Sequence, residues 1–278
     1  MSHPDASAHT ADSPRDAELS ARYVYCVTPS LASETFSCTG IEGRPVYPIS
    51  HGGLSALVHD CRPQPYQGDD ETVKRWVAAH AAVVDAAWAV TGSILPMSFD
   101  AIVEPRGDRT ADDNVRSWLA ENENGFIAKL KEFRDKVELG VHVLWDPAEV
   151  AQRIGAASDE VNRLKQEMAG KPEGVAYFHR QKIAKAVRGL LEAKADADYR
   201  TYYQRITVHA DEVAVNKPTA VEGKQALLSL SILVEKAKVS ALGQELAAIG
   251  AQEGLSVRFT GPWPPYTFAA KIAVLRQP

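Results

Sequence analysis

Cysteine is scarce in this sequence, long apolar runs are missing, and neither sign of charge dominates. The three cysteines, Cys26, Cys38 and Cys61, form no Cys-x-x-Cys pair. This set argues against a disulfide framework and a zinc site, and it favours a reducing, cytoplasmic setting. No stretch of about 18 apolar residues occurs, so we predict no membrane span. The net charge is −5 and no basic face or tail stands out, which argues against a nucleic-acid partner.

The sequence also lacks the glycine-rich signatures of several enzyme classes. It contains no Gly-x-Ser-x-Gly elbow, no phosphate-binding loop and no dinucleotide-binding glycine pattern. We interpret His51-Gly52-Gly53 as a turn between two strands. His59 and Cys61 are interpreted as structural residues, because no second ligand pair accompanies them. His80 lies on the apolar face of a helix and is interpreted as an interior histidine with satisfied hydrogen bonds. We therefore predict no catalytic, cofactor or metal site and no enzymatic activity.

The length of 278 residues exceeds the usual size of one hydrophobic core, so two domains are expected. Residues 1–20 are polar, lack the apolar run of a secretory signal, and are predicted to be a disordered tail. Residues 21–145 are predicted to form a ferredoxin-like α+β domain, with two helices covering one face of a mostly antiparallel sheet. Its predicted strands are 22–28, 46–49, 54–59, 94–103 and 137–145, and its predicted helices are 69–91 and 112–136.

Residues 146–278 are predicted to form a second α+β domain with a long helical hairpin. Asp146-Pro147 opens a helix, and apolar residues from Val150 to Met168 follow alternating steps of four and three, as in a helix–helix seam. A bend at 170–174 is expected to send a second helix, 175–210, back along the first. A strand at 228–234, a helix containing Leu242 and Ile249, and a strand at 255–260 follow. The hairpin is expected to cover this last sheet.

One segment near the end of the sequence has an unusual composition. It reads Gly261, Pro262, Trp263, Pro264, Pro265 and Tyr266. The prolines fix φ and remove backbone donors, so the segment is predicted to lie outside any helix or central strand, as a rigid frame for two large rings. Such rings anchor either a binding partner or the protein's own domains. The residues alone leave both readings open, a partner-binding motif and an internal clasp.

This segment, preceded by Thr260 and followed by Thr267-Phe268, resembles the C-terminal motif of the gas vesicle protein F/L family. Further resemblances extend over residues 22–270. They are Tyr23-Val24-Tyr25, Leu95-Pro96-Met97 with Phe99, Glu138-Leu139-Gly140-Val141, Gly174-Val175-Ala176-Tyr177 and Leu233-Val234-Glu235. Four positions depart from the family's pattern. Cys26 stands where the family tends to have Gly, Ser98 and Asp100 where it often has Arg and Gly, and His142 where Lys is common.

The resemblance implies a minor component of gas vesicles, the gas-filled protein shells that give cells buoyancy. It implies a structural or assembly protein in the cytoplasm and at the gas vesicle, whose partners are the main shell protein and other vesicle accessory proteins. It also implies the two-domain α+β fold predicted above. Two other functions remain open from the residues. One is a small-molecule-binding or enzymatic α+β protein, and the other is an interaction adaptor unrelated to gas vesicles.

Overall fold

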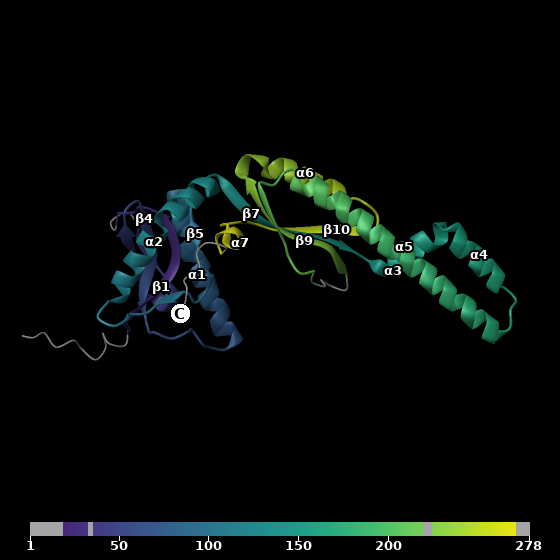
Figure 1. Ribbon diagram of the computed structural model, residues 1–278, viewed down its shortest axis with the longest axis horizontal. Coiled ribbons are helices and arrows are strands. Elements are labelled where there is room, and N and C mark those ends of the chain that lie inside the picture. The colour runs from purple at the N-terminus through teal and green to yellow at the C-terminus, as the bar shows by residue number, and fades with distance from the viewer. Residues whose placement is uncertain (1–18, 33–35, 219–223, 271–278) are drawn as a thin grey trace, which may run out of the picture. The chain divides into compact units, whose positions relative to one another are not determined.

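The computed structural model describes residues 19–32, 36–218 and 224–270 (Figure 1). Most of the predicted disordered tail, residues 1–18, lies outside the described residues. The chain forms two compact units. The first contains the chain up to Asp135 and again from Pro264, and the second contains Lys136–Trp263. The chain is an α+β protein, as predicted.

The first unit is built on an antiparallel sheet with strand order β2-β3-β4-β1-β5, and β6 also pairs with β1. The strands are β1 (Ala21–Pro29), β2 (Cys38–Thr39), β3 (Pro45–His51), β4 (Leu54–Cys61), β5 (Leu95–Pro96) and β6 (Ile102–Val103). His51-Gly52-Gly53 forms the predicted turn between β3 and β4, and Gly52 has the positive φ of 53° that such a turn requires. A short 3-10 helix, η2 (Ile41–Gly43), precedes β3.

Two helices pack on this sheet, and their ends carry the predicted signals. Helix α1 (Asp70–Thr91) begins where the Asp69 carboxylate accepts the Thr72 backbone N–H, and it ends at Gly92, whose φ is 70°. Helix α2 (Ala111–Phe133) begins at a capping box between Thr110 and Asp113. Asp69 and Asp113 therefore act in the caps, whereas Asp112 forms an ion pair with Arg22 (2.7 Å).

The prediction of one continuous strand over 94–103 is wrong, because the structure has two short strands there, β5 and β6. Asp100, between them, has a φ of 72°, which a β-strand cannot contain. Its backbone N–H donates to the Tyr23 hydroxyl (3.1 Å). The apolar composition of the segment reflects burial beside β1, with the chain turning at Asp100.

The second unit has a four-stranded antiparallel sheet with order β10-β7-β9-β8. Its strands are β7 (Lys136–Trp145), β8 (Glu212–Val215), β9 (Gln225–Glu235) and β10 (Leu255–Trp263). Helix α5 (Glu173–Thr207) packs on β9, and α6 (Val239–Gly250), which follows η3 (Lys236–Lys238), packs on β10. Leu228, Leu230 and Ile232 alternate along β9 and are almost fully buried.

The boundary between the units differs from the predicted one at residue 145. Strand β7 was assigned to the first domain, but it pairs with β9 on one side and β10 on the other. It is thus a central strand of the second sheet. Order along the sequence could not show this, because both partners come more than 70 residues later in the chain.

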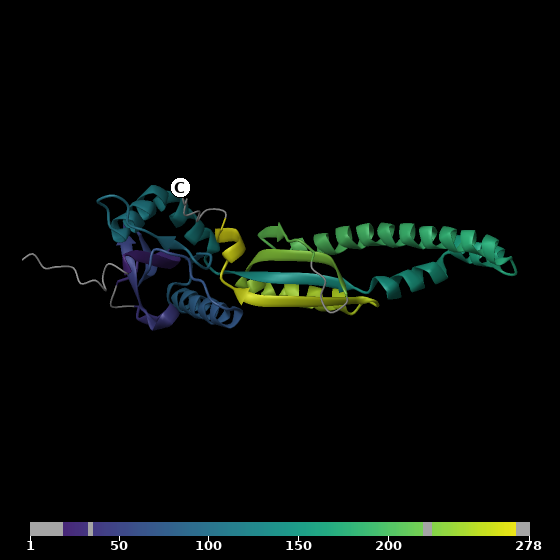
Figure 2. The ribbon, with the colours of Figure 1, turned by 90° about the horizontal axis from the view of Figure 1, so that it is seen from below.

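The predicted helical hairpin is present, but its first arm is two helices. Helix α3 (Pro147–Ala157) ends at Ser158, which adopts an extended conformation and caps α4 (Asp159–Met168) by accepting the Val161 N–H. Val150 and Val161 are buried, as the apolar spacing predicted. Figure 2 shows α5 running past the ends of the strands, with α3 and α4 alongside it.

Candidate functional site

The six-residue motif predicted as a binding or clasp segment is divided between two elements. Gly261, Pro262 and Trp263 end β10, and Tyr266 begins a short helix, α7 (Tyr266–Ala269). The prediction that the segment lies outside any central strand is confirmed, because β10 is an edge strand, in which Trp263 still pairs with Glu138 of β7 after a bulge. The prediction that it lies outside any helix is wrong for Tyr266, which begins α7. β10 lies at the end of its sheet, so the prolines are compatible with the strand.

Glycine is required at the first position of the motif. Gly261 has a φ of 112°, and a Cβ atom there would lie 2.8 Å from the carbonyl oxygen of Glu138. The peptide bond from Gly261 to Pro262 is cis. This close approach lies in the bulge between Thr260 and Trp263, after which the strand pairs with β7 again at Trp263.

The two rings of the motif lie in different environments. Trp263, in the second unit, is 49% exposed, and so is its neighbour along β10, Phe259, at 58%. Tyr266, in the first unit, packs against that unit's core, with its ring centroid 6.4 Å from that of His80. Phe268 is fully buried. The motif thus combines an exposed ring on an edge strand with a ring packed into a core.

A hydrogen-bonded network of tyrosine and histidine occupies that core. The Tyr23 hydroxyl lies 2.9 Å from Nδ1 of His80, and Nε2 of His80 lies 3.1 Å from the Met97 carbonyl oxygen. Since a carbonyl only accepts, Nε2 carries the proton and Nδ1 accepts from Tyr23. Burial lowers the pKa of His80 to about 4, so the ring is neutral. His80 is therefore the satisfied interior histidine that we predicted.

His59 and Cys61 are also buried structural residues. Nε2 of His59 lies 2.9 Å from the Tyr66 hydroxyl. Burial, reinforced by the charge of Arg44, lowers the pKa of His59 to about 4. Burial raises the pKa of Cys61 to about 12, which keeps the thiol protonated and unreactive. Among the described residues, no group of three His, Cys, Asp or Glu side chains is arranged to hold a metal ion.

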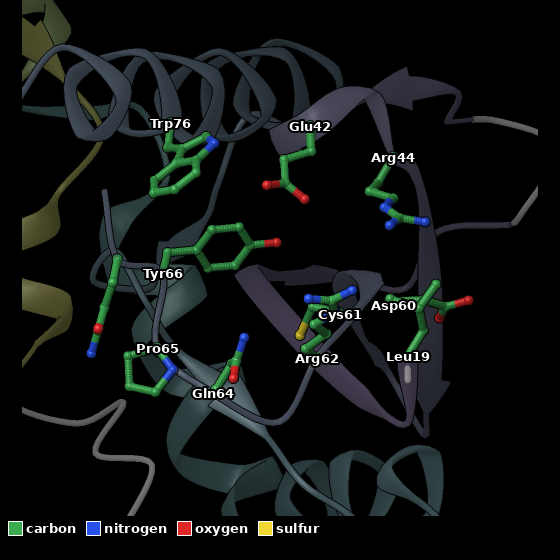
Figure 3. Close-up of a pocket in the computed structure, with 11 residues that line it drawn as sticks. Leu19, Glu42, Arg44, Asp60, Cys61, Arg62, Gln64, Pro65, Tyr66 and Trp76 are labelled. Atoms are coloured by element: carbon green, nitrogen blue, oxygen red, sulfur yellow. The ribbon is translucent and has the colours of Figure 1, made fainter. Parts of the chain in front are cut away.

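A cavity of about 310 Å³ opens beside this network in the first unit (Figure 3). Its lining is mostly polar and combines carboxylates, guanidinium groups, amides and two aromatic rings. The lining residues are Leu19, Glu42, Arg44, Asp60, Cys61, Arg62, Gln64, Pro65, Tyr66, Gln67 and Trp76. Figure 3 shows Glu42, Arg44 and the Tyr66 hydroxyl directed at the same space, with Trp76 at one side.

The loop carrying Tyr66 is held by Asp100. The Tyr66 N–H donates to the Asp100 carboxylate (3.0 Å), while the Asp100 N–H donates to Tyr23. Asp100 stands where the resembling family often has Gly, and its φ of 72° is one that glycine adopts freely. Aspartate keeps this conformation and adds a carboxylate that anchors the loop.

The sequence did not single out this cavity. Trp76 was recognised only as part of a buried helix face, and Glu42, Arg44 and Tyr66 carried no motif. The one usable signal was Glu42-Gly43, where a turn is expected. Two other histidines lie outside this network. Nδ1 of His142 lies 3.1 Å from the Ser229 hydroxyl on the second sheet, and His51 is the last residue of β3.

The fold and these surfaces define an α+β protein with an exposed aromatic edge strand, and in the described residues no helix is long and apolar enough to cross a bilayer. The family model of the "Gas vesicle synthesis protein GvpL/GvpF" matches residues 21–270. This chain belongs to that gas vesicle protein family.

Relatives agree with this assignment, and a solved structure shares the fold. Gas vesicle protein L1 of Halobacterium salinarum is 32% identical over 278 residues, covering 97% of each chain. Gas vesicle protein F of a Streptomyces species is 29% identical, covering 88% of this chain and 98% of the relative. The crystal structure of GvpF from Anabaena shares the fold, with a TM-score of 0.73 at 19% identity and coverage of 90% and 98%.

Proposed function

We propose that this protein is an accessory or minor structural protein of gas vesicles that binds the main shell protein and other vesicle proteins during assembly. Family membership supports a vesicle role, and the family description names synthesis. In this role the protein works in the cytoplasm and at the vesicle. Covering the apolar surface of unassembled shell subunits would keep them from aggregating, which gives a soluble partner a clear physical purpose.

The observation that carries the proposal is the exposed aromatic edge of the second sheet. In the described residues β10 pairs only with β7, so one edge of the strand offers backbone groups to an incoming chain. Phe259 and Trp263 place about half of each side chain in solvent on this strand. An apolar segment that adds to β10 would gain backbone hydrogen bonds and cover both rings.

Co-purification with the main shell protein tests the proposal. We expect the wild-type chain to retain the shell protein, and the double substitution Phe259→Ala with Trp263→Ala to reduce retention at least about tenfold, as for loss of aromatic anchors at an interface. Phe178→Ala is the matched control, because that ring is 67% exposed on α5, away from β10. Circular dichroism should show that all variants are folded.

Two results would count against it in different ways. If the double variant retains the shell protein as well as wild type does, β10 is not the binding surface. If wild-type protein never associates with the shell protein, and deletion of the gene leaves vesicles unchanged, the assembly role itself is wrong.

A further inference from the structure

The cavity of the first unit is a feature separate from the aromatic edge of the second unit. Its volume of about 310 Å³ suits a small molecule and is too small for a folded segment of a partner. Its walls come from four separate places in the sequence: Leu19 before β1, η2 and the residue after it, the end of β4 with the loop that follows, and the first turns of α1. The space is therefore a product of the fold.

Four charged side chains line this space: Glu42, Arg44, Asp60 and Arg62. Asp60 is engaged elsewhere, because it pairs with Arg22 (3.2 Å) and accepts from the Tyr47 hydroxyl. Glu42 lies in η2 and Arg44 directly follows that helix. In the described part of the chain neither side chain makes a hydrogen bond or ion pair. Both act on the same group: Glu42 raises the pKa of the Tyr66 hydroxyl and Arg44 lowers it, although burial has the largest effect. A carboxylate and a guanidinium thus border one volume around Tyr66.

Aromatic rings form the adjoining wall. The rings of Tyr66 and Trp76 have centroids 5.1 Å apart and an interplanar angle of 72°, which is an edge-to-face pair. Faces of such rings attract cations, and quaternary ammonium groups in particular. The carboxylate of Glu42 on the same cavity adds a charge of the sign that a cation requires.

The backbone that positions these groups is held in unfavourable conformations. Glu42 has a φ of 55° and Asp100, which anchors the Tyr66 loop, has a φ of 72°. A non-glycine residue pays about 1 kcal/mol or more for such a conformation, and these residues cluster at ligand-binding sites. Two of the three positions of this kind in the described residues border or support the cavity, and the third is Asp135.

We propose that the cavity binds a small zwitterion of the amino-acid or betaine class. The ammonium end lies among Glu42, Tyr66 and Trp76, and the carboxylate end pairs with Arg44. The lining carries two carboxylates and two guanidinium groups, so a ligand with a single charge meets repulsion as well as attraction, whereas a zwitterion pairs with both signs. This inference does not depend on binding to the shell protein.

Titration of the full-length, ¹⁵N-labelled protein with glycine betaine and with glycine tests the inference. We expect at least one of them to cause saturable shifts of the Trp76 indole signal and of the backbone signals of Glu42 and Arg44. Trp76→Phe identifies the indole signal. Tetramethylammonium carries only the ammonium group of betaine, and acetate carries only the carboxylate. Each should bind at least about tenfold more weakly than betaine, because it makes only one of the two charge contacts.

Glu42→Gln and Arg44→Gln should each weaken binding by about tenfold or more, which is the effect of losing one charge-assisted contact. Glu121→Gln and Arg200→Gln make the same changes at exposed helix positions and should leave binding unchanged. The inference is overturned if neither zwitterion causes saturable shifts, if the single-charge probes bind as tightly, or if the two cavity variants bind like wild type. Matching thermal unfolding curves exclude loss of folding as the cause.

Discussion

Tyr23 links two parts of the first unit through its hydroxyl. The group accepts the Asp100 N–H and donates to His80, which in turn donates to the Met97 carbonyl oxygen. These atoms come from three segments of the chain: β1 with Tyr23, α1 with His80, and the segment of Met97 and Asp100. A fully buried Tyr23 ring brings the turn between β5 and β6 next to α1, and the buried polar atoms gain the partners that burial requires.

Removing this hydroxyl should destabilise the protein. Tyr23→Phe leaves Nδ1 of His80 and the Asp100 N–H without a partner in a buried site. We expect a loss of about 1–3 kcal/mol in the free energy of unfolding, measured by urea denaturation. Tyr177→Phe is the control, because that ring is 54% exposed on α5, and it should change stability little. An unchanged unfolding midpoint in Tyr23→Phe would show that the network contributes nothing to stability.

The buried histidines predict a dependence of stability on pH. His59 and His80 have pKa values lowered from 6.5 to about 4, so between these values the unfolded chain binds protons that the folded chain does not. Their contribution is complete above about pH 6.5 and is lost as the pH falls towards 4. Each histidine adds a slope of up to about 1.4 kcal/mol per pH unit in that window.

Urea denaturation at several pH values measures this slope. His59→Gln and His80→Gln should each flatten it relative to wild type, whereas His51→Gln, in the turn after β3, should leave it unchanged. A wild-type slope that neither buried substitution alters would contradict the assignment.

At the scale of elements, Ser158 shows how one residue divides a helix. Periodicity in Val150–Met168 runs through it without interruption, and yet α3 ends and α4 begins there. The serine hydroxyl accepts the Val161 N–H and so provides the new helix with a cap. Both helices still pack on α5, because their apolar residues lie at positions that face it.

Ser158→Ala should weaken α4 without affecting the sheet. Loss of the cap typically costs about 1 kcal/mol, so amide hydrogen exchange in Asp159–Met168 should quicken about fivefold if α4 opens locally. Ser240→Ala removes an exposed hydroxyl from α6 that caps nothing in the described residues, and it should leave exchange in α4 unchanged. Equal exchange in wild type and Ser158→Ala would mean that packing on α5 alone holds α4.

At the scale of the whole molecule, the first unit is completed by the end of the chain. The segment from Pro264 belongs to that unit, and it brings Tyr266 and the fully buried Phe268 to its core. Large-to-small changes at buried aromatics cost about 3–5 kcal/mol. The first unit should therefore not reach full stability without the segment that begins at Pro264.

A chain that stops after Trp263 tests this dependence. Amide exchange in β1 and α1 should become much faster, because the core loses two aromatic side chains, while exchange in β7 and β9 should change little. A chain that stops after Ala270 is the control, and it should behave like the full-length protein in all four elements. Unaltered exchange of β1 in the shorter chain would show that the final segment does not stabilise the first unit.

Much of the fold could be predicted from local signals. The helix start at Asp69, the cap at Asp146, the turn at Gly52 and the strand at β9 depend on neighbouring residues, and the structure bears them out. Two predictions were wrong, a single strand over 94–103 and a single helix running through Ser158, because both relied on the spacing of apolar residues. Apolar spacing records which side chains are buried, but it does not record where the backbone turns between them.

The sequence by itself determined the family, the α+β class and the stiffness of the Gly261–Tyr266 segment, because each rests on residue types at fixed spacing. Only the tertiary structure decided that β7 is a central strand of the second sheet, since pairing with β9 and β10 is a non-local choice. It also decided that Trp263 is exposed while Tyr266 is packed in a core. The cavity around Tyr66 was also visible only in the tertiary structure, because segments distant in the sequence meet there only when the chain has folded.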